Sequence, residues 1–172
     1  MSRIVLSAAV ITLGLVTSAP AQTVALPDLP AAIKPGELKA YLAVPAKGVQ
    51  IYVCNKAADG NWAWGFKGPE AELSDTAGAR LGKHYAGPTW EGSDGGKVVG
   101  AVKASAPAPD ANAIAWLLLD VKSREGSGKF TEAGAILRVN TVGGTAPAGG
   151  CDEARAGSEL RVPYTATYYF LK

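Results

Sequence analysis

The chain has 172 residues and a formal net charge of +2, and 48% of its residues are hydrophobic. One domain with one core is the natural organisation for this length. Because Lys and Arg stand singly among Gly and Ala instead of forming a basic face, the sequence argues against a nucleic-acid partner.

Residues 1–21 have the organisation of a secretory signal peptide. Arg3 supplies a positive start, residues 4–16 carry no charge, and Ala19–Ala21 offers the small-x-small pattern that a signal peptidase accepts. The apolar run is about 13 residues, whereas a bilayer needs roughly 20 helical residues, so cleavage after Ala21 is favoured over an uncleaved anchor. We therefore expect a periplasmic or secreted protein with no transmembrane segment after cleavage.

The proline-rich residues 22–36 predict a flexible leader, and residues 37–172 a single β-rich domain. Alternating side chains over residues 38–44 predict a strand. Pro45–Gly48 predicts a turn, and the β-branched run Val49–Cys54 predicts the strand that completes a hairpin.

A third strand follows the predicted turn at Asp59-Gly60. Trp62, Trp64 and Phe66 occur at period two and place three aromatic rings on one face. Further strands are predicted at residues 97–103, 114–121, 135–141 and 164–171. Glycines and prolines separate these runs, and no long segment has a helical period. The pattern is typical of an all-β sandwich or barrel with little helix, and it does not choose between the two.

The two cysteines, Cys54 and Cys151, both belong to the exported part of the chain. In an oxidising compartment a disulfide between them is the favoured interpretation, and it would close a loop of about 100 residues, worth up to ~4.7 kcal/mol. The alternative is a metal-binding or catalytic thiol. Neither cysteine has a CxxC neighbour or an adjacent histidine, which disfavours that alternative.

A single histidine, His84, excludes many kinds of catalytic site. Zinc held by three imidazoles and a HExxH helix both need more than one. A Ser-His-Asp triad also lacks support, since no serine lies in a G-x-S-x-G elbow. Gly126-Ser127-Gly128 begins like a dinucleotide loop, but Thr131 replaces the third glycine. We expect no cofactor.

Glu70 and Glu72 would point the same way from an extended chain, with Asp75 just beyond. Paired carboxylates can hold calcium or act as acid and base. Without spaced ligands such as D-x-D-x-D, a face exposed to water is the favoured interpretation, and no metal site is predicted.

The segment from His84 to Glu91 gathers an imidazole, a phenol, an indole and a carboxylate around two glycines and a proline. A loop of this kind suits the wall of a pocket, so His84, Tyr85, Trp90 and Glu91 are candidate binding residues. The alternative is structural: Tyr85 and Trp90 pack on the core while His84 bonds a backbone carbonyl.

Exposed tryptophans could stack on flat ligands such as sugar rings. Trp64 is therefore a candidate binding residue, although aromatic side chains at period two belong more often to a core. Glu70, from the acidic pair described above, is a further candidate. Trp116, followed by three leucines, is predicted to be buried.

Several motifs together are similar to one family. Its pattern is followed by Gly48–Tyr52 with Cys54, Trp64-x-Phe66-Lys67-x-Pro69-Glu70-Ala71-x-Leu73, Gly82–Glu91, Pro107–Pro109, Ile114–Leu119, Arg138–Thr141 with Gly143-Gly144, Gly150–Asp152, Val162–Tyr164 and Tyr168–Phe170. On these motifs residues 38–172 resemble a family of secreted bacterial and fungal proteins, the domain of unknown function numbered three-four-five-five. The resemblance implies export, one β-rich domain and cysteine pairing, and it implies no activity, substrate or catalytic residue.

The scarcity of catalytic groups favours a non-enzymatic module that binds a small molecule or a cell-envelope component through the His84–Glu91 loop. A hydrolase would instead use Glu70, Glu72, His84 or Glu91 as acid and base. A third possibility is a structural or adhesive surface protein, which would have no pocket. Convergence of His84, Glu70 and Glu91 in one concave site would favour the enzyme.

Overall fold

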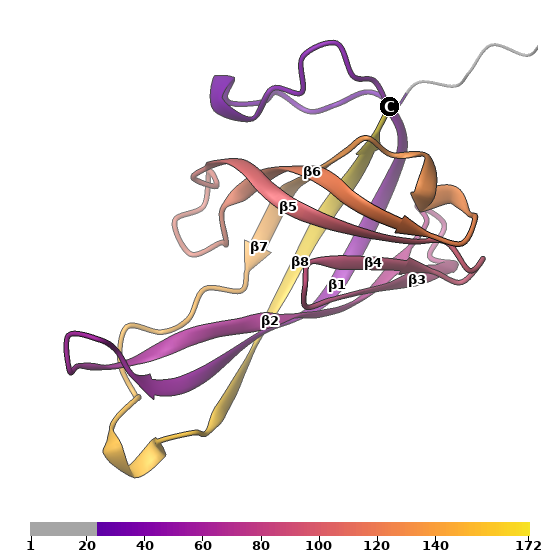
Figure 1. The fold of residues 1–172 in the computed structure, drawn as a ribbon. Coiled ribbons are helices and arrows are strands. Elements are labelled where there is room, and N and C mark those ends of the chain that lie inside the picture. The colour runs from indigo at the N-terminus through magenta and orange to yellow at the C-terminus, as the bar shows by residue number, and fades with distance from the viewer. Residues whose placement is uncertain (1–23) are drawn as a thin grey trace, which may run out of the picture.

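The computed structural model describes residues 24–172 as eight consecutive antiparallel strands that close into a barrel (Figure 1). Strand β1 closes the barrel by pairing with both β2 and β8. The strands are β1 (Ala40–Lys56), β2 (Trp62–Ser74), β3 (Arg80–Tyr85), β4 (Thr89–Gly92), β5 (Lys97–Ala106), β6 (Trp116–Glu125), β7 (Ala135–Gly143) and β8 (Glu159–Leu171). The predicted all-β class is confirmed, and between sandwich and barrel the chain adopts the barrel.

Three short 3₁₀ helices are the only helices within these residues: η1 (Ala31–Ile33), η2 (Lys129–Glu132) and η3 (Glu153–Arg155). None of the helices in residues 24–172 has the length and apolar character needed to cross a membrane. The predicted signal peptide and its cleavage site lie outside the described residues.

The hairpin predicted between residues 38–44 and 49–54 is wrong, because β1 runs through Pro45–Gly48 without a turn. Pro45 pairs with Thr167 of β8, and pairing with β2 starts one residue later. Proline is tolerated at such an edge. Gly48 is required by a close approach, since a Cβ there would lie 2.1 Å from the Glu70 carbonyl oxygen. Pro45 and Gly48, which predicted a turn, are therefore both accommodated in a continuous strand.

The segment predicted as a loop from His84 to Glu91 is instead the β3–β4 hairpin. A close backbone approach and a tight turn explain two glycines here, and neither requires a long loop. Gly82 allows the Glu91 carbonyl oxygen to approach, since a Cβ would lie 2.1 Å from it, and Gly87 occupies the turn with a φ of +118°. His84 pairs directly with Trp90 across this hairpin.

The barrel wall is buried on both faces along β6 and β7. Leu119 and Ile136 belong to the interior cluster, whereas Leu118 and Leu137 belong to a second cluster on the outer face. Ile33 is fully buried in that outer cluster, where residues 24–36 lie against the barrel. Burial on both faces explains the uninterrupted leucine run of β6. The flexibility expected of residues 22–36 stays a prediction.

One end of the barrel interior is filled by aromatic packing. Helix η2 places Phe130 against Phe170 of β8, with the ring centroids 4.5 Å apart and the planes 8° from parallel. Ile136 and Leu73, both fully buried, belong to the same cluster. We call this part of the interior, around Phe130, Ile136 and Phe170, the filled end.

The predicted disulfide is confirmed. Cys54 in β1 is bonded to Cys151 in the segment between β7 and β8, with the two Cα atoms 5.4 Å apart. Figure 1 shows the β1–β2 hairpin and the segment with η3 projecting together beyond the β3–β4 hairpin. The bond therefore joins two projections that lie at the end opposite η2.

Candidate functional site

The short β3–β4 hairpin leaves a notch in the barrel wall. Strand β2 pairs with β3 only from Glu70 to Ser74, and β5 pairs with β4 only from Lys97 to Val99. On that side, residues 62–69 of β2 and 101–106 of β5 have no neighbouring strand among residues 24–172. The notch opens into the barrel interior at the end that η2 does not fill, which we call the open end.

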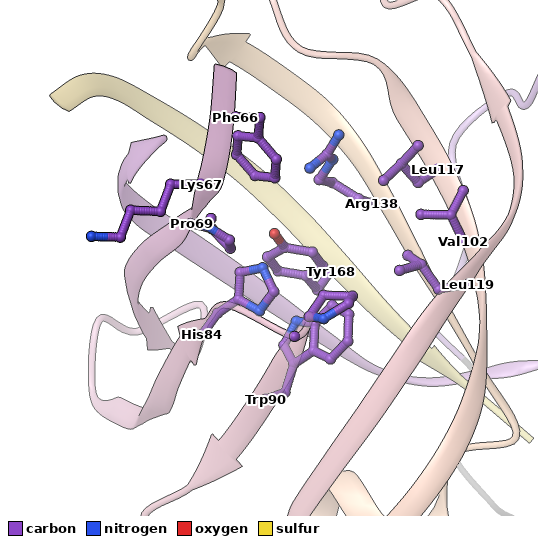
Figure 2. Close-up of a pocket in the computed structure, with 13 residues that line it drawn as sticks. Phe66, Lys67, Pro69, His84, Trp90, Val102, Leu117, Leu119, Arg138 and Tyr168 are labelled. Carbon is purple, nitrogen blue, oxygen red and sulfur yellow. The ribbon is translucent and has the colours of Figure 1, made fainter. Parts of the chain in front are cut away.

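A cavity of about 170 Å³ lies behind this notch (Figure 2). Its rim includes Phe66 and Val102, whose exposed fractions are 59% and 56%. The interior wall is formed by His84, Trp90, Leu117, Leu119, Arg138 and Tyr168, which come from β3, β4, β6, β7 and β8. Side chains that are distant in the sequence thus surround one partly open space.

The register of β7 and β8 determines where the apolar interior becomes polar. Ile136 pairs with Phe170 at the filled end, and two residues further along β7 Arg138 pairs with Tyr168. Alternate residues of a strand share a face, so Arg138 and Tyr168 also point inward. Arg138 is at the same time opposite Leu117 of β6. The barrel therefore places a guanidinium group in its own interior.

The imidazole of His84 is buried in the wall of the cavity. Its Nδ1 donates a hydrogen bond to the Thr89 carbonyl oxygen at 2.8 Å, because a carbonyl can only accept. The ring stacks on Trp90 at 4.5 Å between centroids. Burial lowers the pKa of His84 from 6.5 to about 3, helped by the charge of Arg138 and opposed by the Thr89 hydrogen bond. His84 is consequently neutral at neutral pH.

The Arg138 guanidinium is anchored by backbone but not neutralised. Its Nε and Nη2 donate to the carbonyl oxygen of Ala115 at 3.1 and 2.8 Å. Within the described part of the chain it forms no ion pair with a carboxylate. Burial raises the pKa of the Tyr168 phenol well above its usual value, while Arg138 lowers it in part. A half-buried positive charge therefore stands beside a neutral phenol.

Two buried N–H groups near Arg138 lack acceptors. Trp90 is completely buried, and its Nε1 has no hydrogen-bond partner among residues 24–172. Gln50 is 2% exposed, and its Nε2 lies beside the Tyr164 hydroxyl without completing a hydrogen bond of good geometry in the described chain. Gln50 lines a groove of about 410 Å³ that shares Phe66, Leu117 and Arg138 with the cavity. An unmet buried donor costs about 1–3 kcal/mol, and both atoms are closed off from the cavity and the groove in the free protein.

The sequence-predicted site residues divide between the two faces of the barrel wall. His84 and Trp90 line the cavity together, as their pairing across the hairpin requires. Tyr85 and Glu91 follow them by one residue and therefore point outward. There the Tyr85 hydroxyl donates to Glu91 at 2.7 Å, and Lys83 pairs with the same carboxylate at 3.1 Å.

The remaining predicted residues also lie outside the cavity. Glu70 pairs with Arg161 at 2.9 Å and Glu72 with Arg80 at 2.6 Å, both well exposed. Trp64 donates its indole N–H to the Gly149 carbonyl oxygen at 3.0 Å. Glu70 and Glu72 share a second, outer groove of about 540 Å³ with His84 and Tyr85, but Glu91 does not line that groove. His84, Glu70 and Glu91 therefore do not all converge in one concave site. In residues 24–172 no three His, Cys, Asp or Glu side chains are grouped to hold a metal ion.

Arg138 and Tyr168 are the inward-facing polar residues of the cavity that sequence reasoning did not select. The sequence indicated their importance only through their positions, because alternate residues of a strand point to the same face. In β7 an arginine occupies the inward position that follows Ile136, inside a run whose outward positions are also apolar. An inward charge in a strand buried on both faces is unusual unless something pairs with it.

Over residues 24–172, fold and cavity together define an eight-stranded antiparallel barrel with a partly open, mostly apolar pocket in its interior. A family model described as a protein of unknown function, DUF3455, matches residues 34–172, and the chain belongs to that family. The resemblance seen in the sequence motifs is thereby confirmed. Neither the curated proteins nor the solved structures contain a match to the chain.

Proposed function

We propose that this protein binds a small molecule in the cavity at the open end of the barrel. One observation carries the proposal: Arg138 presents a positive charge without a carboxylate partner, within residues 24–172, to a cavity otherwise walled by apolar and aromatic side chains. Burying an unpaired charge is costly, and ligand sites commonly combine apolar walls with a few placed polar groups.

The size of the barrel and of the cavity is consistent with this function. Barrels of eight strands have interiors that side chains can just fill or that hold one small ligand. An apolar cavity of about 150 Å³ is known to admit benzene, so a cavity of about 170 Å³ has room for one ring. Larger parts of a ligand would extend through the notch toward Phe66 and Val102.

A binding role fits these side chains better than hydrolysis does. A general acid or base needs a pKa near the working pH. His84 is held neutral with its pKa near 3, and Glu70, Glu72 and Glu91 are paired with basic residues on the outer face. The cavity favours a binding role over that of a purely adhesive surface protein, for which we expected no pocket.

A calorimetric titration with benzyl alcohol, a neutral one-ring probe, tests the proposed function. We expect saturable binding to the wild-type protein and its loss in Val102→Trp, which narrows the notch. Val142→Trp is the matched control, because Val142 is 60% exposed against 56% for Val102 and does not line the cavity. No binding to the wild type, or equal binding by both variants, would contradict the proposal.

We further propose that the protein works outside the cytoplasm after signal-peptide cleavage. The Cys54–Cys151 disulfide supports this location, since disulfides persist in oxidising compartments. N-terminal sequencing of the mature protein tests it directly. We expect Gln22 at the amino terminus, and a mature chain that starts at Met1 would contradict the proposal.

A further inference from the structure

Arg138 is the cation that a ligand in the cavity would meet. Two basic residues line the cavity, Lys67 and Arg138. The Lys67 ammonium pairs with Glu159, and Figure 2 shows its side chain directed away from the cavity, whereas the Arg138 guanidinium extends into it. The bonds to Ala115 use two of the five N–H groups of the guanidinium, and the guanidinium also lies against the Tyr168 hydroxyl. The group has five donors, so N–H groups remain for a ligand.

The unmet groups around this space are donors. The Nε1 of Trp90 and the Nε2 of Gln50 are buried and have no partner in residues 24–172. Arg138 lies where the cavity and the groove that contains Gln50 meet. The two neutral N–H groups are closed off from the cavity in the free protein, so Arg138 sets the requirement on the ligand. A guanidinium group requires acceptors, so the complementary ligand supplies oxygens and a negative charge.

The planar guanidinium and the small apolar cavity together favour one kind of anion. Its planar set of donors matches a carboxylate in a two-point arrangement that an ammonium cannot make. The apolar wall around Trp90 and Leu119 has room for about one ring or a short branched chain. We propose that the site takes a small carboxylate whose charged group pairs with Arg138 and whose apolar part lies against Trp90 and Leu119.

This inference rests on the proposed function, since it names the ligand class of the same site. Benzoate and benzamide separate the two proposals, because they have nearly the same shape and differ in charge. Calorimetry on the wild-type protein at pH 7 should give benzoate an affinity at least about tenfold higher than that of benzamide, as expected for a charge-assisted hydrogen bond.

The variant arm compares Arg138→Met with Arg124→Met. Arg124 is a matched control, because its guanidinium also donates to backbone carbonyl oxygens, those of Thr131 and Ala133, and it does not line the cavity. Arg138→Met should abolish the preference for benzoate, and Arg124→Met should retain it. Near-ultraviolet circular dichroism verifies that each variant folds.

Each outcome decides one of the two proposals. Equal binding of benzoate and benzamide by the wild-type protein would overturn the carboxylate proposal and leave a neutral binding site standing. Binding of neither compound would overturn both. If Arg138→Met does not fold, the comparison of the two ligands on the wild-type protein decides alone. A benzoate preference that survives in a folded Arg138→Met protein would also overturn the assignment.

Discussion

The filled and open ends of the barrel interior are built from the same strands, yet they have different chemistry. Strands β7 and β8 contribute Ile136 and Phe170 to the filled end and Arg138 and Tyr168 to the open end, in directly successive inward pairs. Helix η2 adds Phe130 at one end, whereas the short β3–β4 hairpin leaves a notch at the other. Aromatic packing of the interior is therefore concentrated at one end, and the groups able to recognise a ligand lie at the other.

The largest expected effect is on the free energy of unfolding, and it is measured by replacing one phenylalanine at each end of the barrel. Phe170→Ala should lower the free energy of unfolding by about 3–5 kcal/mol, because it leaves a void beside Phe130 in a fully buried cluster. Phe66→Ala is the control at the open rim and should cost less than about 1 kcal/mol, since Phe66 is 59% exposed. Urea denaturation measures both, and similar losses would contradict the division.

The next effect concerns the covalent bond near the open end. Replacing both Cys54 and Cys151 by alanine should lower the free energy of unfolding by about 2–4 kcal/mol, since the bond closes a separation of 97 residues in the unfolded chain. The measurement is denaturant unfolding of the oxidised wild type against the double variant. Unchanged stability would mean that the bond does not constrain the unfolded state.

The buried histidine should make stability depend on pH. The folded pKa of His84 is about 3 against 6.5 for the free side chain, so the unfolded state binds the proton more readily between these values. The contribution is fully present above pH 6.5 and is lost as the pH falls toward 3. Between pH 7.5 and 5 we expect this one group to remove about 2 kcal/mol.

Proton NMR can follow this titration without assignment, because the chain has one histidine. The imidazole signals should stay those of the neutral ring down to about pH 4, provided that the protein remains folded. His84→Gln should remove the corresponding part of the pH dependence of unfolding. A midpoint near pH 6.5 in the folded protein would contradict burial of the ring at the site.

The smallest effect is expected on the outer face of the wall. Glu70→Gln breaks a solvent-exposed pair with Arg161 and should change the free energy of unfolding by less than about 1 kcal/mol. It should also leave benzoate binding within about twofold, since Glu70 does not line the cavity. Unfolding and calorimetric titration measure the two effects, and a large loss of affinity would return Glu70 to the binding site.

Patterns along single segments explain how much was predictable. Alternation and turn residues predicted the β class and most strands, and two cysteines in a chain expected to be exported predicted their bond. Pro45 and Gly48 misled because their roles depend on neighbouring strands, the edge next to β2 and the approach of Glu70. Local sequence does not show which strand will lie beside a residue.

The candidate site was predictable only in part for the same reason. His84 and Trp90 were selected from a conspicuous segment, and their inward direction follows once that segment is a hairpin. Arg138 acquires its meaning from its register with Leu117 and Tyr168 on two other strands. The notch depends on strand lengths across the whole barrel. The environment of Arg138 and the notch both depend on how the strands pair, and the sequence of a single segment does not reveal that pairing.

The most direct test of a binding site at the open end is a titration with benzoate. It is followed through the tryptophan indole N–H signals in a proton–nitrogen correlation NMR spectrum. The chain has four tryptophans, of which Trp90 lines the cavity and Trp116 is buried in the outer cluster. Both indole N–H groups lack partners in residues 24–172, so Trp116 is an internal control. We predict a saturable shift of the Trp90 signal with Trp116 unchanged, whereas no shift, or equal shifts of all four signals, would contradict the account.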